Sequence, residues 1–208
     1  MEGSFFRTRA LFWSFWANFI FIIGMIGYLL MDGLDYMRPN LINSTLTFAI
    51  YVILAAIFVF NAFFQMLSLY HVHSSTHRYY IMVLSCVFDK IGSDAYFLGA
   101  LLAATAFTDS KTVWTCNTVG VGAFVIGAVV NMMVRGSSMF YSLANILNLL
   151  GSLLYLLAAF LTLVPVTQII VIVGDIVYLI DAFLYMTCWF SDRQSALPQG
   201  EETRLVVK

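Results

Sequence analysis

Six long apolar blocks, separated by connections of one to 14 residues, constrain this chain more than any other feature. Each block holds 21 to 29 residues, and about 20 apolar residues are enough for an α-helix to cross the hydrocarbon core of a bilayer. Only 10% of the residues are charged, whereas a soluble domain carries roughly 25%. The sequence therefore predicts an all-α membrane protein and excludes an ordinary soluble domain.

The apolar blocks predict six transmembrane helices within residues 11–190. Residues 1–10 precede them as a short N-terminal segment, and residues 191–208 follow as a polar tail. Connections this short make consecutive helices antiparallel neighbours, with Pro165 at the tightest corner. We therefore expect a polytopic helix bundle without a soluble domain. The predicted spans are 11–31, 46–70, 79–107, 113–134, 140–164 and 166–190.

Basic residues are distributed unevenly between the two sides of the predicted bundle. Lysine and arginine are enriched in the cytoplasmic loops of membrane proteins. If both termini are cytoplasmic, seven basic residues lie inside and two lie outside, so we expect this orientation. The inside residues are Arg7, Arg9, Arg78, Arg135, Arg193, Arg204 and Lys208, and the outside residues are Arg38 and Lys111.

Charged residues also lie near the middle of two predicted spans. One charge at that depth costs about 2.5 to 3.5 kcal/mol on insertion scales, so such side chains are normally paired or face water. In the third span the charged residues share one arc of the helix, and in the sixth span they share an arc with Tyr178. We predict a midplane cluster that joins the two spans and is centred on Lys90, which can also pair within its helix with Asp94. The five charged residues are Asp89, Lys90, Asp94, Asp175 and Asp181.

The cluster has two interpretations. Intramembrane acids that change protonation are the usual parts of proton and cation pathways, which would make the protein a small transporter or channel. The same residues could instead form a structural ion pair that fixes helix register. The second interpretation fits a non-catalytic subunit or scaffold of a membrane assembly. Its partners would be lipid and other membrane subunits or further copies of the chain. We take the scaffold as the first hypothesis and transport as the alternative.

Neutral polar residues form stripes on the second and fifth predicted spans. Each stripe lies on one side of its helix. We expect these residues to form hydrogen bonds between helices, worth about 0.6 kcal/mol each, rather than a cargo site. They are Asn61, Gln65 and Ser68 on the second span, and Asn145, Asn148, Ser152, Tyr155 and Thr162 on the fifth.

Three histidines between the second and third spans resemble part of a metal site. His73 and His77 are four residues apart and could share a helix face, with His71 nearby. No cysteine lies close by, and no acidic residue is closer than Asp89, so a full ligand set is missing. We expect these histidines to lie at the lipid headgroups and expect no bound metal.

No motif for hydrolysis or phosphate binding occurs in the sequence, so we expect neither an enzyme nor a cofactor. One catalytic alternative stays open, an intramembrane acid pair of Asp89 or Asp94 with Asp175. The net charge of −1 gives no basic surface for nucleic acid.

A glycine followed four residues later by an aromatic residue recurs in five of the six predicted spans. A repeated spacing of this kind indicates a repeated helical unit, here duplicated helical hairpins. The pairs are Gly24 and Tyr28, Gly92 and Tyr96, Gly120 and Phe124, Gly151 and Tyr155, and Gly174 and Tyr178.

The last hairpin, residues 141–188, resembles the YrhK-like family of small bacterial membrane proteins. The resemblance is carried by the run from Leu149 to Tyr155, with Gly151-Ser152 at its centre, and by the run from Val173 to Ile180. In that family two spans each carry an apolar-Gly-Ser-apolar-x-aromatic run, and Asp175 stands here in place of the second serine. The resemblance implies a helical hairpin and no particular chemistry.

Overall fold

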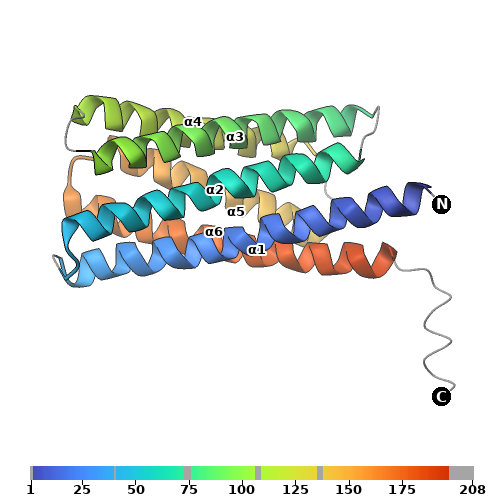
Figure 1. Ribbon diagram of the computed structural model, residues 1–208, viewed down its shortest axis with the longest axis horizontal. Coiled ribbons are helices and arrows are strands. Elements are labelled where there is room, and N and C mark those ends of the chain that lie inside the picture. The colour runs from blue at the N-terminus through green and yellow to red at the C-terminus, as the bar shows by residue number, and fades with distance from the viewer. Residues whose placement is uncertain (1, 40, 73–75, 106–108, 135–137, 197–208) are drawn as a thin grey trace, which may run out of the picture.

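The computed structural model describes residues 2–39, 41–72, 76–105, 109–134 and 138–196. These residues form six α-helices that run side by side along one axis (Figure 1). We call the end of the bundle where α1 begins and α6 ends the terminal end, and the opposite end the distal end. The helices are α1 (Glu2–Met37), α2 (Ser44–Val72), α3 (His77–Ala104), α4 (Ser110–Met132), α5 (Met139–Phe160) and α6 (Val164–Ala196).

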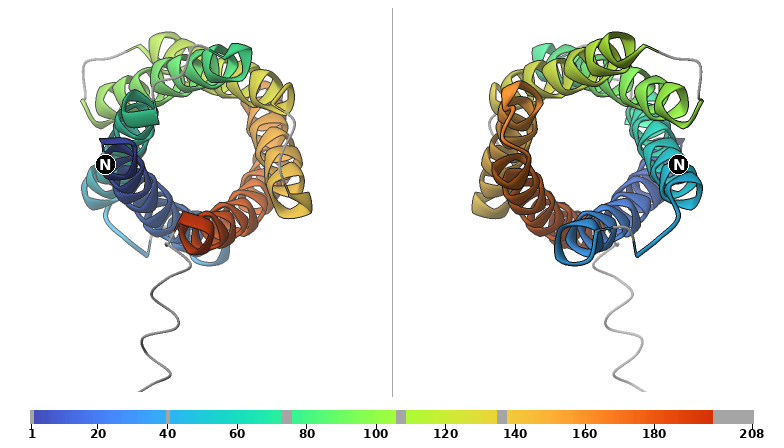
Figure 2. Two further views of the ribbon diagram at one scale, coloured as in Figure 1. Left: turned by 90° about the vertical axis from the view of Figure 1, so that its right-hand side faces the viewer. Right: turned by 90° about the vertical axis from the view of Figure 1, so that its left-hand side faces the viewer.

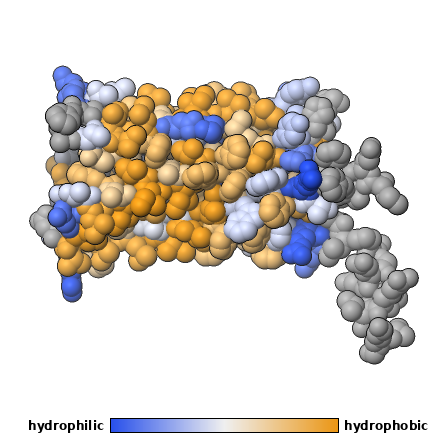
Figure 3. Space-filling model, in the orientation of Figure 1, coloured by the Kyte–Doolittle hydropathy of each residue, from blue (hydrophilic) through white to orange (hydrophobic). Residues whose placement is uncertain are grey.

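The surface of the bundle has the character of a membrane protein. Five of the six helices in the described part of the chain are long and apolar enough to cross a bilayer. Large apolar side chains are exposed along the outside, and Figure 3 shows them as a hydrophobic belt between more hydrophilic ends. The prediction of an all-α membrane bundle is confirmed. The remaining helix, α3, differs because Asp89, Lys90 and Asp94 lie in its middle.

The helices are arranged as a closed ring in chain order (Figure 2). Each helix packs against the helix before it and the helix after it, and α6 returns to pack against α1. The indole Nε1 of Trp189 on α6 donates a hydrogen bond of 2.7 Å to the carbonyl oxygen of Leu11 on α1. Because the ring has six members, α3 and α6 lie on opposite sides of its interior.

Local sequence explains where several helices begin. Ser138 accepts a hydrogen bond from the backbone N–H of Tyr141 at 3.2 Å and so caps α5. Thr76 caps α3 in the same way through Tyr79. Pro165 is the second residue of α6, where its missing N–H leaves no helical hydrogen bond unmade.

Several helices differ in length from the predicted spans. α1 begins at Glu2 and continues to Met37, and α6 continues through residues 191–196. α5 ends at Phe160, four residues before the predicted end of its span. The predicted spans mark apolar stretches that match the hydrocarbon core, whereas a helix can continue through polar residues into the headgroup layer.

The recurring glycines let the two helices of a hairpin approach each other. A methyl group on Gly151 of α5 would lie 3.0 Å from the ring of Tyr178 on α6, and one on Gly174 of α6 would lie 3.1 Å from the ring of Tyr155 on α5. Each aromatic ring therefore covers the glycine of the opposite helix.

The second hairpin repeats this close approach, whereas the first shares it only in part because α2 contains no glycine. In the second, a methyl group on Gly120 of α4 would lie 2.9 Å from the carbonyl oxygen of Gly92 on α3 and 3.2 Å from Cβ of Tyr96. In the first, Tyr28 of α1 stacks on Phe58 of α2 with ring centroids 5.3 Å apart. The repeated spacing in the sequence thus corresponds to a repeated contact in the structure.

Candidate functional site

Two adjoining cavities occupy the interior of the ring. The outer one, about 250 Å³, extends from exposed Asp192 at the terminal end to Asp89. The inner one, about 90 Å³, ends at Tyr28, Tyr96 and Tyr155. Both exceed the roughly 10 to 15 Å³ that one water molecule requires. The two cavities share wall residues, and we treat them together as the interior cavity. The shared residues are Asn18, Gln65, Asp89, Asn148 and Tyr185.

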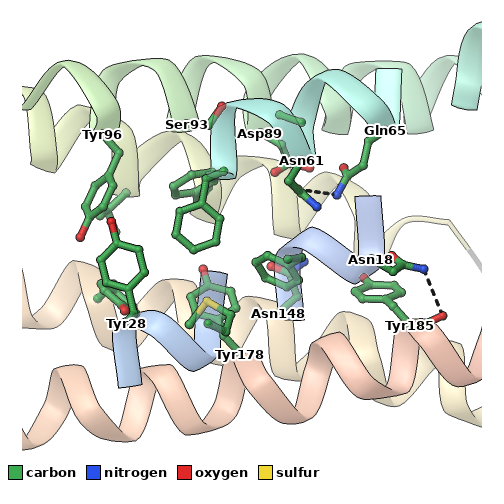
Figure 4. A pocket seen from close by; sticks show the side chains of 17 residues that line it. Asn18, Tyr28, Asn61, Gln65, Asp89, Ser93, Tyr96, Asn148, Tyr178 and Tyr185 are labelled. Atoms are coloured by element: carbon green, nitrogen blue, oxygen red, sulfur yellow. Dashed lines mark hydrogen bonds between the residues drawn. The ribbon is translucent and has the colours of Figure 1, made fainter. Parts of the chain in front are cut away.

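The outer part of the interior cavity is more polar than the inner part, which is lined largely by apolar and aromatic side chains, and the charged lining residues are acidic. Figure 4 shows Asn18, Gln65 and Tyr185 around its outer part and Tyr28 and Tyr96 at its inner end. Asp89 and Asp192 are its charged lining residues, and no lysine or arginine of the described segments lines it. A cavity lined by one sign of charge attracts ions of the opposite sign, so this one favours cations.

Hydrogen bonds between neighbouring helices build the wall of the outer part. The hydroxyl of Tyr185 on α6 donates to Oδ1 of Asn145 on α5 at 2.6 Å. Nδ2 of Asn131 on α4 donates to the same oxygen at 3.0 Å, so three helices meet at one side chain. Nδ2 of Asn61 on α2 donates to the carbonyl oxygen of Ala17 on α1 at 2.7 Å.

These contacts confirm the predicted hydrogen bonds between helices for Asn61 and Asn145. Gln65 differs, since it donates to Asn61 in its own helix, and Gln65, Asn61 and Asn148 also line the cavity. Ser152 and Tyr178 also join α5 to α6, with their hydroxyl oxygens 2.7 Å apart, and the Ser68 hydroxyl donates to the carbonyl oxygen of Ala10 at 2.9 Å. Thr162 is a further exception, since it lies exposed after the end of α5.

A chain of hydroxyl and carboxyl groups continues from the inner end of the cavity toward the distal end. The hydroxyl of Tyr155 on α5 donates to Asp175 on α6. The carboxyl of Asp175 interacts with that of Asp32 on α1, and the hydroxyl of Tyr51 on α2 donates to Asp32. We call Tyr155, Asp175, Asp32 and Tyr51 the carboxyl chain.

The two acids of the carboxyl chain differ in their surroundings. Asp175 is fully buried, and one of its oxygens has no hydrogen-bond partner among the described residues. Asp32 is partly exposed. Two ionised carboxylates that interact in a medium of low dielectric constant repel each other.

Asp181 on α6 is a further buried acid. It is fully buried, and neither carboxyl oxygen has a hydrogen-bond partner among the described residues. It interacts through space with Asp89, which reaches the interior from the opposite side of the ring. Acids on α3 and α6 therefore influence each other electrostatically, although these two helices do not pack against each other and Asp181 is not among the residues that line the cavity.

The predicted cluster centred on Lys90 is wrong. Lys90 and Asp94 lie on the outside of the ring, with 28% and 52% of their side chains exposed. The lysine binds both carboxylate oxygens of Asp94, so the predicted pairing within the helix is confirmed. Figure 3 shows a hydrophilic patch halfway along the hydrophobic belt, over α3. The polar arc of α3 is wider than its interior face, so Asp89 points inward while these two residues do not.

The acid that interacts with Asp175 differs from both acids of the catalytic alternative. That alternative paired Asp175 with Asp89 or Asp94, whereas the interacting carboxyl in the structure is that of Asp32. Asp32 follows directly after the predicted end of the first span and was therefore assigned to a loop. Asp32 lies four residues after Tyr28, which itself lies four residues after Gly24, so the three residues share one helix face. This spacing is the signal in the sequence that could have identified Asp32.

The histidines form no metal site in the described part of the chain. Nδ1 of His71 lies 2.7 Å from the carbonyl oxygen of Leu67 in its own helix, and His77 is exposed at the start of α3. His73 lies outside the described residues. Within the described segments no group of three or more histidine, cysteine or acidic side chains could hold a metal ion.

No family model, curated protein or solved structure matches this chain. The resemblance of residues 141–188 to the YrhK-like family therefore stays a prediction.

Proposed function

We propose that this protein conducts protons across a membrane through the interior of its helix ring. All six helices cross the bilayer in this proposal, and both termini are cytoplasmic. The observation that carries it is the continuity between the interior cavity and the carboxyl chain of Tyr155, Asp175, Asp32 and Tyr51.

Water and cations have access from the terminal end. The outer part of the cavity reaches exposed Asp192, and Asp89 lies where the outer and inner parts meet. Both groups are acidic, so they raise the local concentration of protons and other cations.

Selection for protons would occur where the cavity ends. Tyr28, Tyr96 and Tyr155 line its inner end, and Tyr28 is buried with its ring 6.2 Å from that of Tyr96. A hydrated metal ion needs open volume, whereas a proton needs only a series of groups that exchange hydrogens. Tyr155 and Asp175 provide that series directly beyond the cavity.

The distal end supplies the exit. Asp32 is partly exposed and Asp35 is exposed one turn further along α1. Nε2 of Gln168 at the start of α6 donates to Oδ2 of Asp35 at 3.3 Å, which holds the two helix ends together. A proton on Asp32 can thus reach water beside Asp35.

The crossing of α3 is supported by its place in the ring. It lies between α2 and α4 and runs antiparallel to both, so it occupies the same layer as the five more apolar helices. We propose no enzymatic activity and no cofactor, because the sequence carries no catalytic motif and the Asp175 carboxyl is fully buried.

A non-catalytic membrane subunit or scaffold is the second candidate function. The ion pair of Lys90 and Asp94 favours it, because charged side chains on the outside of a bundle require a partner more polar than lipid.

Proton uptake into liposomes tests the proposal. The purified chain is reconstituted around a pH-sensitive dye, and a potassium gradient with valinomycin sets the membrane potential. We expect potential-driven acidification well above that of protein-free vesicles, and sodium flux no greater than in those vesicles. Absence of proton flux would favour the scaffold, and matching sodium flux would indicate a general cation channel.

A further inference from the structure

The ion pair of Lys90 and Asp94 lies on a continuous exposed stripe of α3. Val87, Ile91, Leu98 and Leu101 have between 37% and 46% of their surface exposed, and the side chain of Asp94 is 52% exposed. None of this stripe is covered by another described helix. On the face drawn in Figure 3, a hydrophilic patch interrupts the apolar belt halfway along the bundle.

The spacing of this stripe is that of a helix-packing seam. Residues 87, 91, 94, 98 and 101 follow one another at intervals of four, three, four and three. This spacing is the heptad pattern with which two parallel helices pack at a shallow angle. Asp94 lies at the centre of the seam, and Lys90 lies beside it.

We propose that a second copy of this chain covers the stripe, so that two rings pair through their α3 helices around a two-fold axis along the membrane normal. In such a pair the two α3 helices run parallel and the same residues meet at the same depth. The pairing is separate from proton conduction and does not depend on it.

Charge complementarity argues for a second copy as the occupant. The patch carries one positive and one negative side chain, so it is complementary to itself across a two-fold axis. The flexible lysine stem lets each Lys90 bind Asp94 of its own chain or of the other copy. Pairing would remove from lipid the charged groups that are now exposed.

Disulfide cross-linking of the full chain in lipid nanodiscs or native membranes tests the pairing. Cys86, Cys116 and Cys188 are first replaced by alanine. Leu98→Cys then places a thiol on the seam, and Ile176→Cys on α6 places one at an exposed apolar site on another helix, 42% exposed. We expect Leu98→Cys to form covalent dimers about tenfold more efficiently than Ile176→Cys.

Charge exchange on α3 separates a specific pair from random collision. With Asp94→Lys alone, positions 90 and 94 of both copies would all be positively charged and would lie close to the two-fold axis. Their repulsion should abolish the Leu98→Cys cross-link. Adding Lys90→Asp restores opposite charges and should restore the cross-link, which also shows that the chain has folded. Equal cross-linking at both cysteine sites, an unaltered cross-link in Asp94→Lys, or a Leu98→Cys adduct with a different protein would each overturn the proposal.

Discussion

Tyr155 covers Gly174 with its aromatic ring and donates its hydroxyl hydrogen to the adjacent Asp175. A methyl group on Gly174 would lie 3.1 Å from that ring, so the close packing of α5 on α6 also positions the hydroxyl. One side chain therefore belongs both to the repeated contact that builds the hairpin and to the candidate proton pathway.

Removing the hydroxyl of Tyr155 should impair proton flux without disturbing the fold. Tyr155→Phe keeps the ring on Gly174 but removes the group that exchanges a hydrogen with Asp175. We expect flux into liposomes to fall by about tenfold or more. Tyr70→Phe is the control, because Tyr70 is 75% exposed at the terminal end of α2. Equal flux in the two variants would remove Tyr155 from the pathway.

Native cysteines can report whether the interior cavity is wet. Cys86 lines its outer part, whereas Cys116 packs against Gly99 between α3 and α4. In single-cysteine variants, a membrane-impermeant cationic thiol reagent added from the terminal end should label Cys86 much faster than Cys116. Because Asp89 and Asp192 line the same cavity, an anionic reagent of equal size should be slower. Labelling of Cys86 no faster than Cys116 would indicate a dry interior.

The close approach of α3 and α4 should make the protein sensitive to one methyl group. A methyl group on Gly120 would lie 2.9 Å from the Gly92 carbonyl oxygen, whereas one on Gly122 would meet nothing within 4 Å. We expect Gly120→Ala to lower the free energy of unfolding by about 1 to 3 kcal/mol, and Gly122→Ala to leave it nearly unchanged. Thermal unfolding in detergent measures both. Similar melting temperatures for the two variants would contradict the packing described for this hairpin.

The membrane character and the hairpin repeat could be predicted from the sequence because both follow from local patterns. Apolar length indicated the helices, and the glycine-aromatic spacing corresponds to contacts such as Gly151 with Tyr178. The closed ring could not be predicted, since it depends on α6 packing against α1. One contact of that closure is Trp189 with Leu11, which are far apart in the chain.

The acids of the site were predicted in part. Asp89 and Asp175 were identified by depth and helix face, and both reach the interior of the ring or its wall. Asp32 was missed because the apolar stretch ends before it, although the helix continues to Met37. Lys90 was assigned to the interior because a helical wheel does not show where the interior face of a ring ends.

The most direct test of the proposed pathway compares proton flux into liposomes that contain the Asp175→Asn variant with flux into liposomes that contain the Asp94→Asn variant. Both changes remove one carboxyl near the middle of the bundle, but Asp175 is buried in the carboxyl chain and Asp94 lies outside the ring. Asparagine at position 175 keeps an oxygen that can accept from Tyr155, so packing is preserved. We expect Asp175→Asn to abolish potential-driven acidification of liposomes and Asp94→Asn to retain it. Undiminished acidification with Asp175→Asn would contradict proton conduction through the carboxyl chain.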